Sequence, residues 1–156
     1  EARTTGYVFA FVGIVLAIVQ GFLVGKVVPR VGEGRIVPVA ILTLAAGLAL
    51  VPIARNVTTL VAACGILALG MGFNSPSIMS MISRRAAPDM QGGVLGLSQS
   101  LASLARVIGP AWGGWLYDRY GMVTPYVSAA GLMGVAFLLS IAVIARTPPL
   151  HSQVAE

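Results

Sequence analysis

Four polar side chains stand inside long apolar stretches of this sequence and are its candidates for binding chemistry: Gln20, Asn74, Gln99 and Arg106. Arg106 lies near the middle of one such stretch, 13 residues after Gly93 and 11 before Tyr117. A guanidinium stays charged and donates several hydrogen bonds, so it suits an anionic ligand or a carboxylate on another helix. The plainer alternative is that its long side chain reaches the edge of the stretch and is solvated there.

Asn74 is surrounded by residues that weaken a helix. Pro76 removes one backbone hydrogen bond, and two glycines loosen the turn before it. Asn74 and its serine neighbours can satisfy the freed backbone groups, or they can bind a ligand, as polar groups at interrupted membrane helices do. Gln20 is a weaker candidate of the same kind, because it is the one strongly polar side chain of the first apolar stretch before its charged end.

Several residue sets typical of enzyme catalysis are missing from the sequence. His151 is its only histidine and lies in a polar tail, while Cys64 is its only cysteine and lies in an apolar run, as a small packing residue does. A Ser–His–Asp set, a cluster of metal ligands and a phosphate-binding glycine loop are therefore all absent. We expect neither an enzyme nor a bound metal or cofactor.

The composition indicates that lipid surrounds most of the chain. Of the 156 residues 57% are apolar and only 10% are charged, whereas ordinary soluble domains have about 25% charged residues. The mean hydropathy is +0.91. The net charge of +5 does not indicate a nucleic-acid partner, because the basic residues stand between apolar runs, as in membrane proteins.

Five apolar segments are each close to the roughly 20 residues that a helix needs to cross a bilayer. They cover residues 6–28, 36–54, 57–82, 93–117 and 123–145, and a cytoplasmic tail covers 146–156. Membrane-spanning strands are about half as long and alternate in polarity, which these segments do not. The sequence therefore predicts an all-α fold, a polytopic membrane bundle of five transmembrane helices.

The basic residues assign the two faces of this bundle, since short connections make successive helices antiparallel. One face carries six of them: Lys26, Arg30, Arg35, Arg84, Arg85 and Arg146. The other face carries three: Arg3, Arg55 and Arg119. The basic excess marks the cytoplasmic side, so the C-terminus is expected inside and the first residue outside. That placement, together with the lack of an initiator Met, predicts that the chain begins in the middle of a longer protein.

The fourth segment carries a stripe of small and polar residues at helical spacing. The polar stripe consists of Gly92, Gly96, Gln99, Ser103, Arg106, Pro110, Gly113 and Tyr117. Leucines and other apolar residues occupy the opposite side, so lipid is expected there and not on the polar stripe. The polar stripe either packs closely against other helices or lines an aqueous cavity.

Two motifs resemble the major facilitator superfamily, in particular its twelve-helix drug/proton antiporters of the tetracycline-efflux type. The first resembles the eleventh helix of such transporters and contains Gln91, Gly92, Leu95, Gly96, Ser100, Arg106, Gly109, Pro110, Gly113, Gly114, Leu116 and Tyr117. The second resembles the cytoplasmic loop motif in its second-half copy and contains Gly21, Leu23, Gly25, Lys26, Arg30, Gly32 and Arg35. The resemblance covers the whole chain, as helices 8–12.

Two departures keep another assignment open. Gly25 stands where the loop motif has an Asp, as is common in the second-half copy. The Gly109–Gly114 pattern also matches the antiporter motif at the end of helix five, so the chain could instead cover helices 2–6. The C-terminal half is preferred, because the third segment lacks the Arg typical of helix four and the chain ends in a polar tail.

The resemblance implies a secondary active transporter in a bacterial inner membrane that exports drug-like or other small molecules by proton antiport and alternating access. Its partners would be a small-molecule substrate, the lipid bilayer and the N-terminal half of the same transporter, with no nucleic acid. The chain has no acid at membrane depth to carry the proton. Two alternatives are a facilitator-type carrier of organic anions or metabolites, and a truncated, non-transporting membrane subunit.

Overall fold

A computed structural model describes residues 2–146, with side chains from Thr5 onward, and every regular element in that range is a helix. In chain order they are α1 (Ala2–Ile18), the π-helix η1 (Val19–Leu23), α2 (Val24–Val31), α3 (Glu33–Leu50), the 3-10 helix η2 (Val51–Ile53), α4 (Val57–Arg85), α5 (Gln91–Tyr120) and α6 (Thr124–Arg146). His151 and the rest of the predicted tail after Arg146 lie outside this range.

The first helical rod continues without a break from α1 through η1 to α2, three residues beyond the predicted end at position 28. Within η1, the backbone N–H of Val24 bonds to the carbonyl of Val19, the wider spacing of a π turn. The rod ends at Gly32, whose φ of 87° lies in the left-handed region that favours glycine. This single residue lets the chain turn directly into α3.

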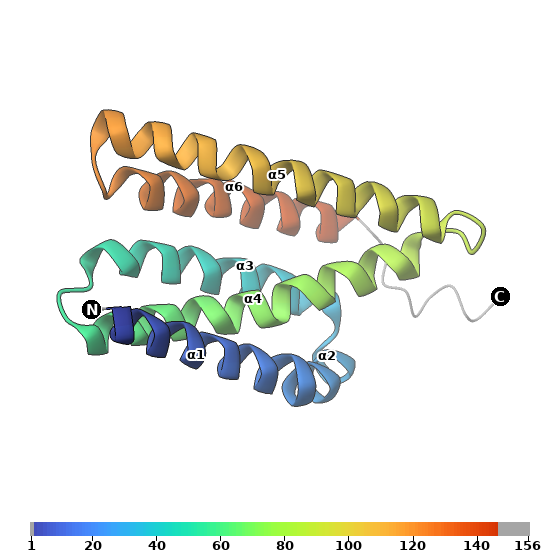
Figure 1. The fold of residues 1–156 in the computed structure, drawn as a ribbon. Helices are drawn as coiled ribbons and strands as arrows, with labels where there is room; N and C mark the ends of the chain where they lie inside the picture. The colour runs from blue at the N-terminus through green and yellow to red at the C-terminus, as the bar shows by residue number, and fades with distance from the viewer. Residues whose placement is uncertain (1, 147–156) are drawn as a thin grey trace.

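The helices run antiparallel to their sequence neighbours, and Figure 1 shows them as long rods side by side. α4 lies between α1 and α3, α6 packs on the other side of α3, and α5 packs on α6 and meets α4 next to their connection. The buried apolar side chains follow this order of packing. They are Val19, Val28, Ile36, Val37, Ala40, Ile41, Ala63, Ala68 and Leu116.

Glycines set the closest approaches around α4. A Cβ built on Gly70 would lie 2.8 Å from Leu44 Cγ and 2.9 Å from the Leu44 backbone nitrogen on α3. One built on Gly72 would lie 2.6 Å from Val19 Cγ1 on the first rod. Small residues at such positions let helix backbones come close enough for dispersion contacts, which are a principal source of helix association in lipid. The α3–α4 and α1–α4 contacts therefore depend on glycine.

Polar groups gather at the helix ends. Asn56 begins α4 with a capping box, in which its Oδ1 accepts from the Thr59 backbone N–H at 2.8 Å and the Thr59 hydroxyl accepts from the Asn56 N–H at 3.3 Å. At the same end of the bundle Trp112 and Trp115 have ring centroids 5.5 Å apart, and Trp115 meets Tyr120 edge-on. Such amphipathic rings are enriched at the membrane–water interface.

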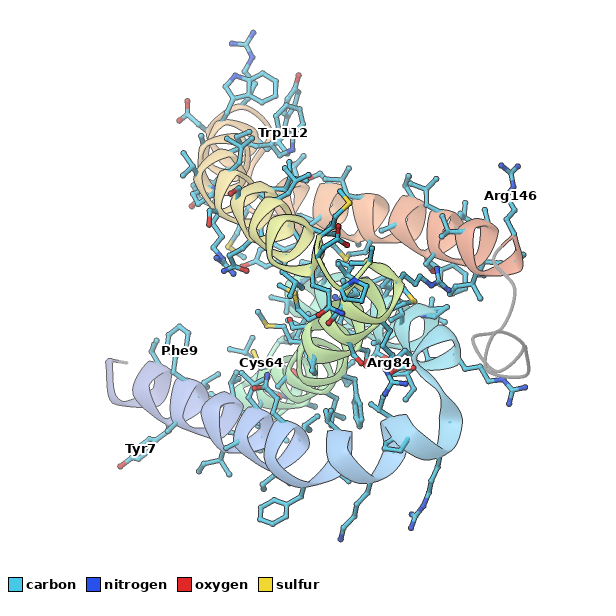
Figure 2. The ribbon with its side chains drawn as sticks, turned by 90° about the vertical axis from the view of Figure 1, so that its right-hand side faces the viewer. Tyr7, Phe9, Cys64, Arg84, Trp112 and Arg146 are labelled. Atoms are coloured by element: carbon cyan, nitrogen blue, oxygen red, sulfur yellow. The ribbon has the colours of Figure 1, made fainter. Side chains whose placement is uncertain are left out.

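Most large apolar side chains point away from the bundle, as in a protein whose solvent is lipid. Tyr7 and Phe9, labelled in Figure 2, are 73% and 71% exposed. In the described part of the chain four helices have the length and composition to cross a membrane: Thr5–Val31, Glu33–Ile53, Val57–Arg85 and Thr124–Arg146. α5 is long enough, but it is not one of the four, because the polar stripe lowers its hydropathy.

Candidate functional site

Most of the polar stripe of α5 is exposed in the described part of the chain. A Cβ added at Gly92 or Gly96 would meet nothing within 4 Å, and Gly113 only approaches the Pro125 Cβ at 4.0 Å. α5 instead contacts its neighbours through another side, where Leu116 is buried. Within residues 2–146 the stripe is thus a polar surface that is uncovered except at Gly113, along a helix whose other exposed side is leucine-rich.

Gln99 and Arg106 lie on this surface, and both are exposed. Seven residues separate them, which places them about two helical turns, or roughly 10 Å, apart on one side of α5. The hydroxyls of Ser100 and Ser103 donate to the carbonyls of Gly96 and Gln99, both at 2.9 Å, so they are satisfied within the helix. Arg106 forms no ion pair with any described residue. Its guanidinium is the charged group that this surface presents.

Asn74 lies on α4 next to a second polar group that lacks a partner. Its Oδ1 and the Oγ of Ser77 are buried without a hydrogen bond, and Ser77 is 0% exposed. Between them Pro76 removes one donor from the helix. The helix nevertheless continues through this point, so the weak sequence here does not interrupt α4.

Gln20 lies in the π turn η1 and is exposed, next to Val19, which packs against Gly72. None of the described hydrogen bonds joins any two of the four candidate residues. Gln99 and Arg106 are brought onto one surface by α5, whereas Gln20 and Asn74 belong to other rods and do not lie on the polar stripe. The structure therefore groups two of the four candidates.

The motif residues have unequal surroundings. Gly32 has the positive φ already described, whereas Gly21, Gly25, Gly109 and Gly114 have nothing within 4 Å of a built Cβ in the described chain. Pro110 is accommodated inside α5 and is exposed. Three basic residues of the loop motif are exposed and form no ion pair with a described residue: Lys26, Arg30 and Arg35.

A charged cluster that the sequence reasoning missed joins α3 and α4 at the basic end. The Arg84 Nε lies 3.3 Å from Glu33 Oε1, and the Ser80 hydroxyl donates to the same oxygen at 2.9 Å. The Glu33 side chain is only 13% exposed, while that of Arg84 is 63% exposed and visible at the end of the bundle in Figure 2. Two features of the sequence could have indicated this ion pair. An acid, Glu33, directly follows the Gly32 turn, and two arginines, Arg84 and Arg85, end a helix antiparallel to α3.

Replacing Glu33 by glutamine should destabilise the full-length protein by about 0.5–1 kcal/mol, because an ion pair with one mostly exposed partner, Arg84, contributes little and the amide oxygen can still accept from Ser80. The measurement is thermal unfolding in mild detergent at low and high salt. The difference from wild type should shrink in high salt, since Arg84 is open to ions. Asp118→Asn at the opposite end is the control, and an equal effect there would contradict a specific role of the pair.

Comparison with known proteins decides the family. The sequence model of the Major Facilitator Superfamily matches residues 2–156. The chain belongs to this superfamily. This major facilitator chain is 29% identical over 126 residues to mouse solute carrier family 22 member 18, covering 78% of this chain and 30% of the relative. It is 32% identical to multidrug resistance protein 2 of Bacillus subtilis (strain 168), covering 82% of this chain and 32% of the relative. No solved structure gives a significant match.

A third similarity, 28% identity, is to the class G tetracycline resistance protein of Vibrio anguillarum, covering 75% of this chain and 33% of the relative. The chain thus spans about a third of the length of these relatives. Membership of the family, which consists of transporters and not of enzymes, confirms the all-helical, multi-pass membrane fold expected from composition.

Proposed function

We propose that this chain forms the last five helices, 8–12, of a twelve-helix secondary active transporter that exports drug-like or other small molecules by proton antiport with alternating access. Two of its relatives are named for multidrug and tetracycline resistance. The proton-carrying carboxylate would lie in the N-terminal half, because the membrane segments of this chain contain no acid at mid-depth. The protein would reside in the plasma membrane of a bacterium.

The uncovered polar stripe of α5 carries this proposal. An Arg at mid-membrane depth costs at least about 2.5 kcal/mol when it faces hydrocarbon, so Arg106 and Gln99 need protein or water beside them. The N-terminal half of the transporter would supply protein contacts, and a substrate cavity between the two halves would supply water. The open sides of the stripe glycines are consistent with such a neighbour.

The proposed orientation places the C-terminus in the cytoplasm. Lys26, Arg30, Arg35, Arg84 and Arg85 lie at the end of the bundle where α2 turns into α3 and where α4 connects to α5, and Arg146 ends α6 there. At the opposite end the described basic side chains are Arg55 and Arg119. This excess supports a cytoplasmic assignment of the first end.

Arg106 supports a second candidate function, that of a facilitator-type carrier of organic anions, because its guanidinium can bind a carboxylate or phosphate directly. The two functions differ in what happens to protons. The test uses the full-length protein in sealed vesicles that contain a pH-sensitive dye, to which cationic drugs and organic anions are added separately. Antiport predicts drug-dependent proton movement, whereas anion flux without proton movement would favour the facilitator.

The third possibility, a truncated subunit without transport, is tested by the same vesicles. Transport by the purified full-length protein alone excludes it. A failure of every substrate class, with the protein shown to be folded and correctly inserted, would contradict both transport functions.

A further inference from the structure

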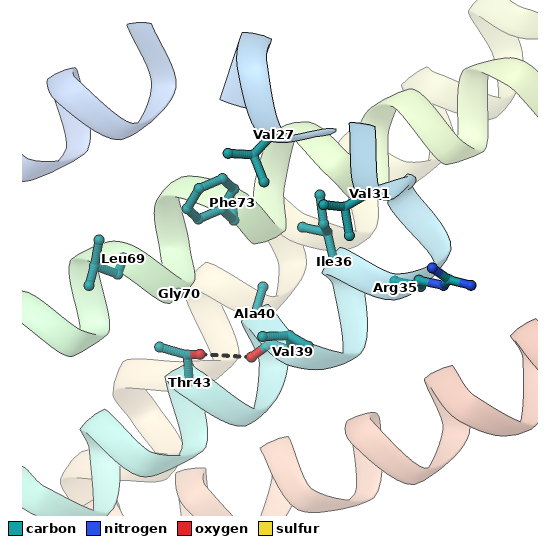
Figure 3. Close-up of a pocket in the computed structure, with 10 residues that line it drawn as sticks. All are labelled: Val27, Val31, Arg35, Ile36, Val39, Ala40, Thr43, Leu69, Gly70 and Phe73. Carbon is teal, nitrogen blue, oxygen red and sulfur yellow. Dashed lines mark hydrogen bonds between the residues drawn. The ribbon is translucent and has the colours of Figure 1, made fainter. Parts of the chain in front are cut away.

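We propose that the basic end of this bundle binds one anionic phospholipid, with an acyl chain in a groove formed by α2, α3 and α4 and its phosphate on Arg35. The groove encloses about 410 Å³ and is shown in Figure 3. Neither α5 nor α6 lines it, so it is separate from the polar stripe. The inference holds whatever substrate the transporter carries.

The lining of the groove suits hydrocarbon. Val27 and Val31 of α2, Ile36 and Ala40 of α3 and Phe73 of α4 all contribute to it. Its floor includes two nearly inaccessible side chains, Ile36 at 7% and Ala40 at 3% exposure, while the rim residues Val31 and Val39 are 44% and 64% exposed. Among the described residues this apolar groove is open along its exposed rim, so an acyl chain can enter it from the side of the bundle.

The polar groups of the groove are arranged for a lipid with a charged head. Thr43 is satisfied within α3, because its hydroxyl donates to the Val39 carbonyl at 2.8 Å, the dashed line in Figure 3. The Thr43 hydroxyl therefore needs no hydrogen-bond acceptor from water or a ligand. Arg35 lies at the other end of the groove, and Figure 3 shows its guanidinium directed away from the apolar side chains.

The distance between these two residues matches one leaflet. Eight residues separate Arg35 from Thr43, so the groove extends about 12 Å along α3 from the charged end. Half of the hydrocarbon thickness is about 15 Å. The acyl chain of a phospholipid whose phosphate contacts Arg35 at the interface would therefore extend along the groove toward the middle of the membrane.

Charge complementarity selects an anionic head group. Arg35 is exposed and makes no ion pair with a described residue, and the acid nearest to it in sequence, Glu33, is engaged by Arg84 and Ser80. Lys26 and Arg30 on α2 add exposed positive charge at the same end. Basic pockets between membrane helices on the cytoplasmic side are a known form of anionic lipid site.

The test is native mass spectrometry of the full-length protein in mild detergent, titrated with dioleoyl phosphatidylglycerol and, separately, dioleoyl phosphatidylcholine. Wild type should retain phosphatidylglycerol more tightly. Arg35→Gln should weaken phosphatidylglycerol binding about fivefold, the effect of one basic residue near a charged head group, and weaken phosphatidylcholine binding less, because that head group carries a phosphate but no net charge. Arg35→Lys should keep most of the preference. Val39→Trp, which fills the groove from its exposed rim, should weaken both lipids.

Matched controls are Arg55→Gln at the opposite end and Val135→Trp on α6, an exposed position at 55% outside the groove. Equal losses in variants and controls would overturn the site, as would unchanged binding in Val39→Trp. Displacement of the lipid by an equal concentration of glycerol 3-phosphate would show that the site binds a free anion, which also overturns the proposal. Circular dichroism tests whether each variant is folded. If Arg35→Gln does not fold, the results for Val39→Trp and Arg35→Lys decide whether the lipid site exists.

Discussion

Replacing Arg106 by alanine in the full-length protein is expected to lower the initial transport rate at least about tenfold while the protein remains folded. Hydrogen bonds to charged groups contribute about 1.5–3 kcal/mol, which corresponds to a factor of ten or more. Arg106 is exposed on the polar stripe and forms no ion pair with a described residue, so its removal leaves no partner charge among the described residues uncompensated. The measurement is initial uptake into inverted vesicles, normalised to the amount of inserted protein.

A lysine at this position separates charge from geometry. Arg106→Lys keeps the positive charge but cannot form the paired, parallel hydrogen bonds that a guanidinium makes to a carboxylate or phosphate. If Arg106 binds an anionic group, the lysine variant should raise KM more than it lowers the maximal rate. If Arg106 only supplies positive potential to the cavity, lysine should restore most of the activity.

Arg119→Ala is the matched control, because Arg119 is also exposed and lies on the same helix, at its end. It should transport at a rate close to that of wild type. Undiminished transport of every substrate by Arg106→Ala would exclude Arg106 as a binding group and would favour the alternative that its side chain reaches the interface and is solvated there.

The fold was predictable because its main determinants are local and long. Apolar runs of about 20 residues can satisfy their backbone hydrogen bonds in lipid only as helices or closed barrels, and their length selects helices. The short, charged connections then impose antiparallel order. The bounds were less predictable: the first rod continues to Val31 because a glycine at position 32, and not the last apolar residue, ends it.

The candidate site was predictable only in part. Helical spacing placed Gln99 and Arg106 on one surface, since that relation is fixed by α5 alone. The pairing of Glu33 with Arg84 joins residues 51 positions apart, and it depends on how α3 and α4 pack. The sequence shows Ser77 beside Pro76. That its hydroxyl is buried without a hydrogen-bond partner depends on the neighbouring helices. Relations between residues of one helix could therefore be predicted from the sequence, whereas contacts between two helices could not.

The same distinction predicts the largest stability effect in this chain. Gly70→Ala should destabilise the full-length protein by about 2–3 kcal/mol, although alanine is the better helix former by about 1 kcal/mol. The new Cβ would lie 2.9 Å from the Leu44 backbone nitrogen and 3.0 Å from the Ala40 carbonyl oxygen, atoms that no side-chain rotation can move. α3 and α4 must therefore separate along their contact. Thermal unfolding in mild detergent measures the effect.

Two comparisons make this explanation specific. Gly131→Ala on α6, where a built Cβ meets nothing within 4 Å in the described chain, should be neutral or slightly stabilising. Leu44→Ala should fail to rescue Gly70→Ala, because the backbone nitrogen and the Ala40 carbonyl remain in place. At Gly72 the nearest obstacles are side-chain atoms, Val19 Cγ1 at 2.6 Å and Val19 Cβ at 2.9 Å. Val19→Ala removes the first and keeps the second, so it should rescue Gly72→Ala only in part. If Leu44→Ala also rescued Gly70→Ala, the contact would be limited by side chains, and glycine would not be required for the approach of α3 to α4.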